Sequence, residues 1–189
     1  MIIKCKTNVP IPVRIHCFLL FTRLLCNRMN YAYIITGGNI GRVADHLATA
    51  ASLLEERCGT IIDRSPIYET EPWGSAQQQN FLNQVLVIET KLSAKEVMNE
   101  IGIIENQMGR ERKEKNGPRI IDVDIVFFNH QVINDPGLTI PHPHMANRRF
   151  VLEPLNQVAP AYIHPVFYKT VKQLLEECPD ELMVKKYDA

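Results

Sequence analysis

Hydrophobic and polar residues follow two different periods along this chain, and the two periods predict separate strands and helices. Apolar residues at every second position, many of them β-branched, predict strands. Apolar residues at every third or fourth position predict amphipathic helices. We expect strands at residues 31–36, within 60–70, at 81–90 and after Pro118, an edge strand at 131–133, and helices at about 42–57, 94–108, 144–155 and 170–177.

This order, β-α-β-β-α-β followed by helical additions, predicts an α+β fold with a ferredoxin-like core, in which helices pack on an antiparallel sheet. Gly37-Gly38-Asn39 predicts a tight turn after the first strand, and Ser93 with Glu96 predicts a capping box. Two long polar segments, 71–80 and 109–118, lie on either side of the site that we predict below on the strand after Pro118. We expect these segments to move and to close on ligand.

The strand after Pro118 carries the most informative pattern. One face is apolar and predicted to be buried, which favours a central strand: Ile121, Val123, Ile125 and Phe127. The opposite face holds Asp122 and Asp124, whose Cα atoms would lie roughly 6.5–7 Å apart. Carboxylates this close resist joint ionisation unless a cation lies between them, and a divalent metal prefers such oxygen ligands.

An isolated Asp-x-Asp pair is more often the solvated face of an edge strand. Here the pair follows a Gly-Pro turn and Arg119, whose guanidinium binds anions through a planar fork. We therefore interpret Asp122 and Asp124 as a metal site that, together with Arg119, holds a polyphosphate.

Composition limits the class of protein. The 189 residues, 46% hydrophobic and 22% charged, predict one globular domain. Because residues 1–29 are basic and contain no Asp or Glu, the remainder is mildly acidic, which argues against nucleic acid as a partner. The five cysteines show no CxxC or zinc spacing, which indicates a reducing cytoplasm.

Residues 1–29 require a separate interpretation. Their apolar run, 15–25, is too short to span a bilayer and is interrupted by Arg23, so we expect no membrane partner. A signal-peptide cleavage site is missing, and a transit peptide is an alternative although Ser is absent. Because Met29 directly precedes the first strand, we interpret 1–29 as a non-native or disordered extension and 30–189 as the single domain.

Two motifs resemble a known family. Residues 115–126, Lys-Asn-Gly-Pro-Arg-Ile-Ile-Asp-Val-Asp-Ile-Val, resemble the signature of the 6-hydroxymethyl-7,8-dihydropterin pyrophosphokinases, and residues 141–155, from Pro-His-Pro-His to Glu-Pro-Leu, resemble their second motif. The similarity extends over about residues 31–165. It implies an ATP-dependent diphosphokinase of folate biosynthesis that transfers pyrophosphate from ATP to the pterin hydroxymethyl group and releases AMP.

The resemblance also implies roles for individual residues. It implies two Mg²⁺ ions at Asp122 and Asp124, which would be catalytic together with Arg110 and Arg119. The implied contacts to ATP are Arg110, Arg112, Arg119, His142 and Arg148, and the implied pterin pocket is Thr70, Pro72, Trp73, Phe81, Asn83 and Phe150. Phe81 and Phe150 would stack on the ring, while the amide of Asn83, on the same strand face as Phe81, would read its polar edge. Glu105 fits the family pattern without an assigned role.

Two departures from the family pattern concern the adenine contacts and loop closure: Asn116 stands where relatives often have an aromatic residue, and Pro143 where some have tyrosine.

One alternative function is another Mg²⁺-dependent phospho- or nucleotidyl transferase, and a second is a non-catalytic nucleotide- or pterin-binding module. The trio Phe81, Asn83 and Phe150 favours a flat heterocyclic acceptor, and paired aspartates argue against a pure binding module. We expect a monomer that acts on small molecules.

Overall fold

The computed structural model describes residues 29–73, 78–110 and 117–188. The interpretation of residues 1–29 (Met29 itself apart), the implied role of Arg112, the departure at Asn116 and the central parts of both polar segments lie outside the described residues. The elements follow in the order β1 (Asn30–Gly38), α2 (Val43–Cys58), β2 (Thr60–Arg64), β3 (Tyr68–Thr70), β4 (Phe81–Thr90), α3 (Ala94–Gln107), β5 (Asp122–Phe128), β6 (Ile133–Asp135), β7 (Leu138–Ile140), η2 (Met145–Asn147), α4 (Arg149–Val158), α5 (Val171–Glu176) and β8 (Val184–Lys186).

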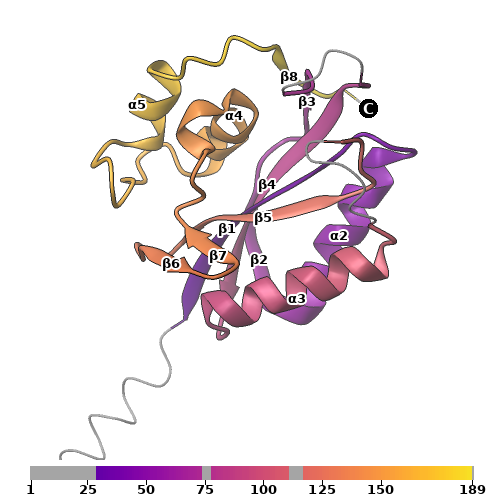
Figure 1. Ribbon diagram of the computed structural model, residues 1–189, viewed down its shortest axis with the longest axis horizontal. Helices are drawn as coiled ribbons and strands as arrows, with labels where there is room; N and C mark the ends of the chain where they lie inside the picture. Colours follow the sequence, from indigo (N-terminus) through magenta and orange to yellow (C-terminus); the bar gives the residue numbers. More distant parts are fainter. Residues whose placement is uncertain (1–28, 74–77, 111–116, 189) are drawn as a thin grey trace, which may run out of the picture.

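The central sheet is antiparallel and confirms the predicted α+β fold. Its strands lie in the order β5-β1-β4-β3-β8, and β2 also pairs with β4 (Figure 1). The first six predicted elements therefore form the ferredoxin-like core. β7 and β8 were not predicted, and the strand expected at 131–133 begins at Ile133 and pairs with β7 in a separate small sheet. The helix expected at 144–155 is divided into η2 and α4.

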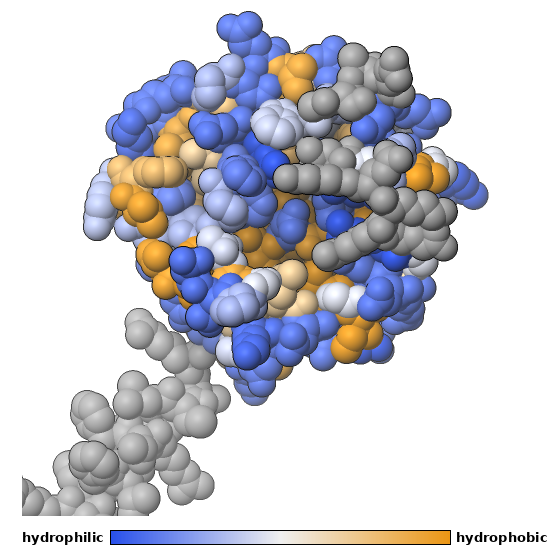
Figure 2. Space-filling view, viewed as in Figure 1, coloured by the Kyte–Doolittle hydropathy of each residue, from blue (hydrophilic) through white to orange (hydrophobic). Residues whose placement is uncertain are grey.

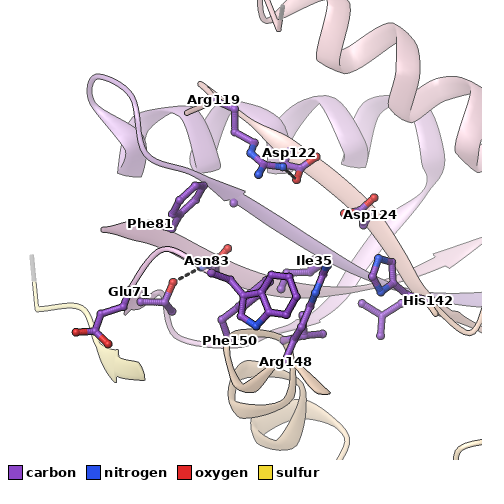
Figure 3. Close-up of a pocket in the computed structure, with 15 residues that line it drawn as sticks. Ile35, Glu71, Phe81, Asn83, Arg119, Asp122, Asp124, His142, Arg148 and Phe150 are labelled. Atoms are coloured by element: carbon purple, nitrogen blue, oxygen red, sulfur yellow. Dashed lines mark hydrogen bonds and ion pairs between the residues drawn. The ribbon is translucent and has the colours of Figure 1, made fainter. Parts of the chain in front are cut away.

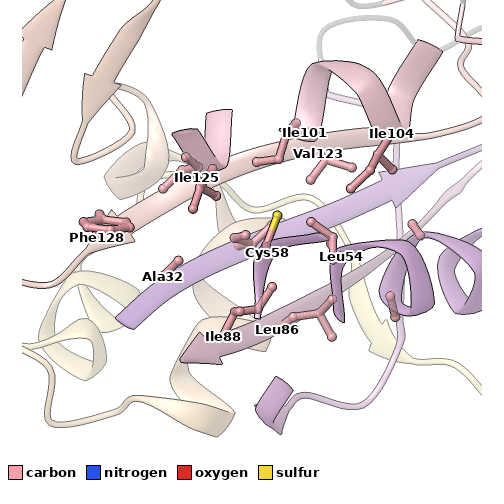
Figure 4. Close-up of a cluster of buried hydrophobic side chains, with 14 of the residues drawn as sticks. Ala32, Leu54, Cys58, Leu86, Ile88, Ile101, Ile104, Val123, Ile125 and Phe128 are labelled. Carbon is pink, nitrogen blue, oxygen red and sulfur yellow. The ribbon is translucent and has the colours of Figure 1, made fainter. Parts of the chain in front are cut away.

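Helices cover both faces of the sheet, so the described part of the molecule has two hydrophobic cores. On one face α2 and α3 pack over β1, β4 and β5, with Leu54, Ile101 and Val123 fully buried (Figure 4). On the other face α4 and α5 pack over Val85 and Phe127. The predicted capping box opens α3. The Ser93 Oγ accepts a hydrogen bond from the Glu96 N–H, and the Glu96 carboxylate accepts one from the Ser93 N–H.

β5 lies at the edge of the sheet, so the prediction of a central strand was wrong. Its residues from Ile125 to Phe128 are all apolar because helices cover both of its faces, and burial on two faces gives the same run at an edge as at the centre. The following segment partly closes the open side, where the His142 N–H donates to the Val126 carbonyl at 3.0 Å.

A β-bulge in β5 corrects the predicted face of Phe127. Tyr33 pairs with Phe127 and the next residue, Ile34, pairs with Ile125, so Val126 is the extra residue. One extra residue shifts the alternation of side chains. Ile125 is buried under α2 and α3 as predicted, whereas Phe127 enters the core under α4 and α5.

Gly37 and Gly38 continue β1 and do not form the predicted tight turn. Their role is close approach. A Cβ on Gly37 would lie 2.1 Å from the Asn83 Oδ1, and a Cβ on Gly38 would lie 2.3 Å from the Ile120 carbonyl oxygen. Side chains at these two positions would therefore separate β1 from its neighbours.

On the face shown in Figure 2 the described residues are largely hydrophilic, and apolar side chains are visible in a hollow near its centre. None of the described helices is long and apolar enough to cross a membrane.

Candidate active site

A cleft lies over the ends of β1, β4 and β5 and is bounded by α4 and the segment that follows β3 (Figure 3). Ten of the predicted site residues line it: Thr70, Trp73, Phe81, Asn83, Arg119, Asp122, Asp124, His142, Arg148 and Phe150. Pro72 and Arg110 do not line it. Five further residues were missed: Ile35, Gly37, Glu71, Val126 and Val151.

Strand register explains how these residues come together. Gly37 of β1 pairs with Asn83 on one side and with Asp122 on the other, so the three lie in one row across adjacent strands. Two strand spacings place the backbones of Asn83 and Asp122 about 10 Å apart. Because Gly37 has no side chain, the floor between them stays open. Two residues before Gly37 in β1, Ile35 pairs with Asp124 in the same way. Gly37 and Ile35 were not predicted as site residues because their place in the site depends on this strand register.

Asp122 is held by two arginines. The Arg110 Nη2 lies 2.6 Å from Asp122 Oδ1, and the Arg119 guanidinium pairs with the other carboxylate oxygen. Arg110 thus reaches the site through Asp122 although it does not line the cleft. When a polyphosphate enters the cleft, either guanidinium could replace its contact to the Asp122 carboxylate with a contact to a phosphate oxygen.

Glu105 connects α3 to this arrangement. Its side chain is buried, and its Oε1 accepts a hydrogen bond from the Val123 N–H at 2.9 Å and pairs with Arg110. Burial raises the pKa of the Glu105 carboxyl, and the Arg110 charge opposes that effect. The structure therefore gives Glu105 a place that the sequence did not: it fixes Arg110 against β5.

Asp124 is the second carboxylate of the pair, and its surroundings disfavour the charged form. Burial, followed by the charges of Asp122 and Glu105, raises the pKa of Asp124 to about 6. A divalent cation bound between the two aspartates would remove that cost, so the donor set fits Mg²⁺. The described residues contain no group of three or more His, Cys, Asp and Glu side chains able to hold a metal. Two carboxylates would leave further coordination positions to phosphate oxygens and water, as Mg²⁺ prefers.

His142 faces the same end of the cleft. Burial, then the charges of Arg148 and His144, lowers the pKa of His142 to about 4, so the ring is neutral near pH 7. Its Nδ1 accepts a hydrogen bond from the His144 N–H at 3.4 Å, which places the ring proton on Nε2. His142 can therefore donate one hydrogen bond without adding a charge.

The other end of the cleft is shaped for a flat ring. Phe81 and Phe150 lie on either side of Asn83 in Figure 3. The Asn83 Nδ2 donates to the Thr70 Oγ1 at 2.8 Å, which fixes the amide plane inside a buried environment. Together these groups provide aromatic faces and one oriented amide.

Arginines contact the aromatic side chains of this end. The Arg119 Cζ lies 5.5 Å from the Phe81 ring centroid. The Arg148 Cζ lies 4.9 Å from the Trp73 ring centroid and 5.7 Å from that of Phe150. Cation–π contacts therefore link the aromatic end of the cleft to its cationic end.

Residues 33–160 match the family model described as 7,8-dihydro-6-hydroxymethylpterin-pyrophosphokinase. The chain is 36% identical over 149 residues to the Aquifex aeolicus 2-amino-4-hydroxy-6-hydroxymethyldihydropteridine pyrophosphokinase, covering 79% of this chain and 92% of that protein. It is 38% identical over 151 residues to the Schizosaccharomyces pombe folic acid synthesis protein fol1, covering 79% of this chain and 21% of the relative.

Among solved structures, the fold resembles a Plasmodium falciparum HPPK-DHPS, with a TM-score of 0.65 at 20% identity over 79% of this chain and 43% of that one. The fol1 protein and HPPK-DHPS are longer than this chain, which spans less than half of either.

Proposed function

The chain belongs to the 7,8-dihydro-6-hydroxymethylpterin-pyrophosphokinase family, and we propose that it transfers the pyrophosphoryl group of ATP to the hydroxymethyl oxygen of 6-hydroxymethyl-7,8-dihydropterin, with release of AMP, in folate biosynthesis. The observation that carries this proposal is the row Asn83–Gly37–Asp122. It brings a flat-ring pocket and a two-carboxylate site into one cleft, separated by about two strand spacings.

At the aromatic end, the pterin would lie between Phe81 and Phe150. The Asn83 amide is already oriented by Thr70, so it can read the polar edge of the ring without losing further side-chain freedom. The hydroxymethyl group would then point along the open floor over Gly37 toward Asp122.

At the cationic end, the pterin hydroxyl oxygen would attack the β-phosphorus of ATP. The bond from that phosphorus to the oxygen shared with the α-phosphate breaks, AMP leaves with the electron pair, and the hydroxyl proton is released to solvent. Arg110 and Arg119, aligned by Asp122, would bind oxygens of the transferred group as charge develops.

Asp122 and Asp124 would hold Mg²⁺, which when bound neutralises phosphate charge. The two Mg²⁺ ions and a monomeric enzyme stay predictions, as does the contact of Arg112 with ATP. Neutral His142 would donate its Nε2 proton to a phosphate oxygen, and Arg148 would contribute a positive charge beside it.

The deciding experiment incubates the protein with ATP, Mg²⁺ and 6-hydroxymethyl-7,8-dihydropterin and identifies the nucleotide product. AMP and pterin diphosphate in equal amounts support pyrophosphoryl transfer. ADP would indicate an ordinary kinase, and no pterin-dependent turnover would contradict the proposal. Asp122→Ala and Asp124→Ala should abolish turnover while leaving pterin binding largely intact. The matched control is Asp135→Ala, an exposed aspartate of β6.

A further inference from the structure

Arg148 combines a fixed backbone with a side chain that has few polar contacts. Its carbonyl oxygen accepts hydrogen bonds from the N–H groups of Val151 and Leu152, both at 3.1 Å, and its own N–H donates to the Met145 carbonyl at 3.3 Å. The residue is thereby anchored at the junction of η2 and α4. Only the side chain is free to change its direction.

The guanidinium of Arg148 lies against aromatic rings. The Nε is buried and has no hydrogen-bond partner among the described residues. A buried polar hydrogen without an acceptor is costly, and burial also lowers the pKa of this side chain. In Figure 3 Arg148 lies between Phe150 and His142, at the boundary between the aromatic and cationic ends of the cleft. Arg148 also lines the cleft, so its guanidinium borders the site where an anion is proposed to bind.

Trp73 approaches Arg148 from the opposite wall. It belongs to the segment after β3 and is 41% exposed, so packing in the core does not account for its position. Its wall is held by the C-terminal segment: the Glu71 N–H donates to the Met183 carbonyl at 3.2 Å, and the Met183 N–H donates to the Glu71 carboxylate at 3.0 Å. The closer of the two ring contacts of Arg148 is the one to Trp73.

We propose that Trp73 is a positioning residue for Arg148: the indole face holds the guanidinium at the cleft, where it can bind an incoming triphosphate. The proposal rests on the proposed function for the identity of the anion. A π face suits this role because it attracts the cation weakly and offers no competing acceptor. A carboxylate in the same place would bind the guanidinium more strongly and would have to be displaced.

The first test needs no nucleotide. Trp73 is the single tryptophan of the chain, so tryptophan emission reports its surroundings alone. Arg148→Met should shift this emission in the ligand-free protein. Arg149→Met, the neighbouring arginine that pairs with Glu153, should leave it unchanged. Unchanged emission in Arg148→Met would overturn the contact on which the proposal depends.

The second test is a double-mutant cycle on the affinity for the magnesium complex of α,β-methylene-ATP, measured by calorimetry. Trp73→Leu should weaken binding by about 3- to 30-fold when Arg148 is present and should have no effect in Arg148→Met. Trp73→Phe, which keeps a π face, should restore most of the affinity. Tyr168→Leu, which alters a side chain that is 82% exposed, is the control.

Equal effects of Trp73→Leu in both backgrounds, or loss of pterin affinity alone, would overturn the positioning role. Binding of this analogue does not depend on the reaction, so a cycle that shows coupling while the product is ADP would reject the proposed function and retain the inference. If Trp73→Leu does not fold, Trp73→Phe and the emission measurement decide the matter.

Discussion

Asn39 and Arg119, 80 residues apart in the chain, exchange two hydrogen bonds at the mouth of the cleft. The Arg119 N–H donates to the Asn39 Oδ1, and the Asn39 N–H donates to the Arg119 carbonyl, both at 2.9 Å. The Asn39 Nδ2 also donates to the Gln79 carbonyl at 3.2 Å. One buried side chain thus fixes the segment that carries the phosphate-binding arginine and the segment that leads into the pterin-binding strand.

Asn39→Ala should lower the free energy of unfolding by about 1–3 kcal/mol, because the partly buried N–H of Arg119 loses its acceptor. Turnover should fall as Arg119 loses its fixed position. Urea denaturation and steady-state kinetics measure the two effects. Asn134→Ala, on an exposed position of β6, should change stability by less than about 0.5 kcal/mol. A stable Asn39→Ala protein with full activity would show that the two segments are fixed by other contacts.

Asp124→Asn should stabilise the metal-free protein at pH 8 while abolishing turnover. The raised pKa of Asp124, about 6 against a usual 3.8, means that the folded state binds this proton more tightly than the unfolded state does. The charged carboxylate therefore destabilises the fold fully above pH 6, and that cost disappears as the pH falls toward 4. The gain should be on the order of 1–3 kcal/mol at pH 8.

Urea denaturation in EDTA at pH 8 and at about pH 4 measures this difference between Asp124→Asn and the unsubstituted protein. The gain should vanish at the lower pH, where Asp124 is already neutral. A variant that is less stable at pH 8 would contradict the electrostatic account.

Asn83→Ala should weaken pterin binding by about 5- to 100-fold, because an oriented amide is lost from a buried pocket. Nucleotide affinity should change much less, since Asn83 lies two strands away from Asp122. Calorimetric titrations with each substrate separate the two effects. Equal losses for both substrates would remove the edge-reading role.

Gly37→Ala should disturb the same pocket from below. The new Cβ would lie 2.1 Å from the Asn83 Oδ1, so either the amide rotates or β1 and β4 separate, at a cost of about 1–3 kcal/mol. Gly102→Ala in α3 is the matched control, because nothing lies within 4 Å of its Cβ and alanine favours the helix by up to about 1 kcal/mol. Unfolding midpoints should therefore move in opposite directions, and equal shifts would exclude the close-approach explanation.

Glu105→Gln should be tolerated better than Glu105→Ala. Gln keeps an oxygen that can accept from the Val123 N–H, whereas Ala leaves this donor buried and unpaired. Both changes weaken the attachment of Arg110, so kcat should fall in both while stability falls chiefly in Glu105→Ala. Denaturation and kinetics on the same preparations provide the comparison. Identical stabilities would show that water replaces the carboxylate.

The element order, and with it the fold, could be predicted from the sequence because each core segment shows a clear period and α3 begins at a strong cap. The position of β5 could not, since helices on both faces hide whether a strand is central. The bulge at Val126 depends on pairing with β1, which no local pattern records, so Phe127 was placed on the wrong face. β8 is a three-residue strand formed by pairing with β3.

For the site, too, local features could be predicted from the sequence, whereas features that depend on strand pairing could not. Residues with distinctive chemistry, such as Asp122 and Asn83, could be predicted from motif and spacing. Gly37 was missed as a site residue because its role depends on strand register, and Glu105 had no role until its contact with the Val123 N–H was known. Among the described residues, Arg110 is connected to the cleft by its ion pair with Asp122.

The pairing of β8 with β3 also determines how the protein should be attached to a sensor chip or to a fused reporter. The C-terminal segment is bound to Thr70 and Glu71, which form one wall of the cleft, so a tether placed after β8 would transmit force to the pterin end. β1 enters the sheet at Asn30, and roughly 23 Å of strand separates that point from Gly37. A linker joined before Asn30 is therefore the choice that leaves ligand responses unaltered.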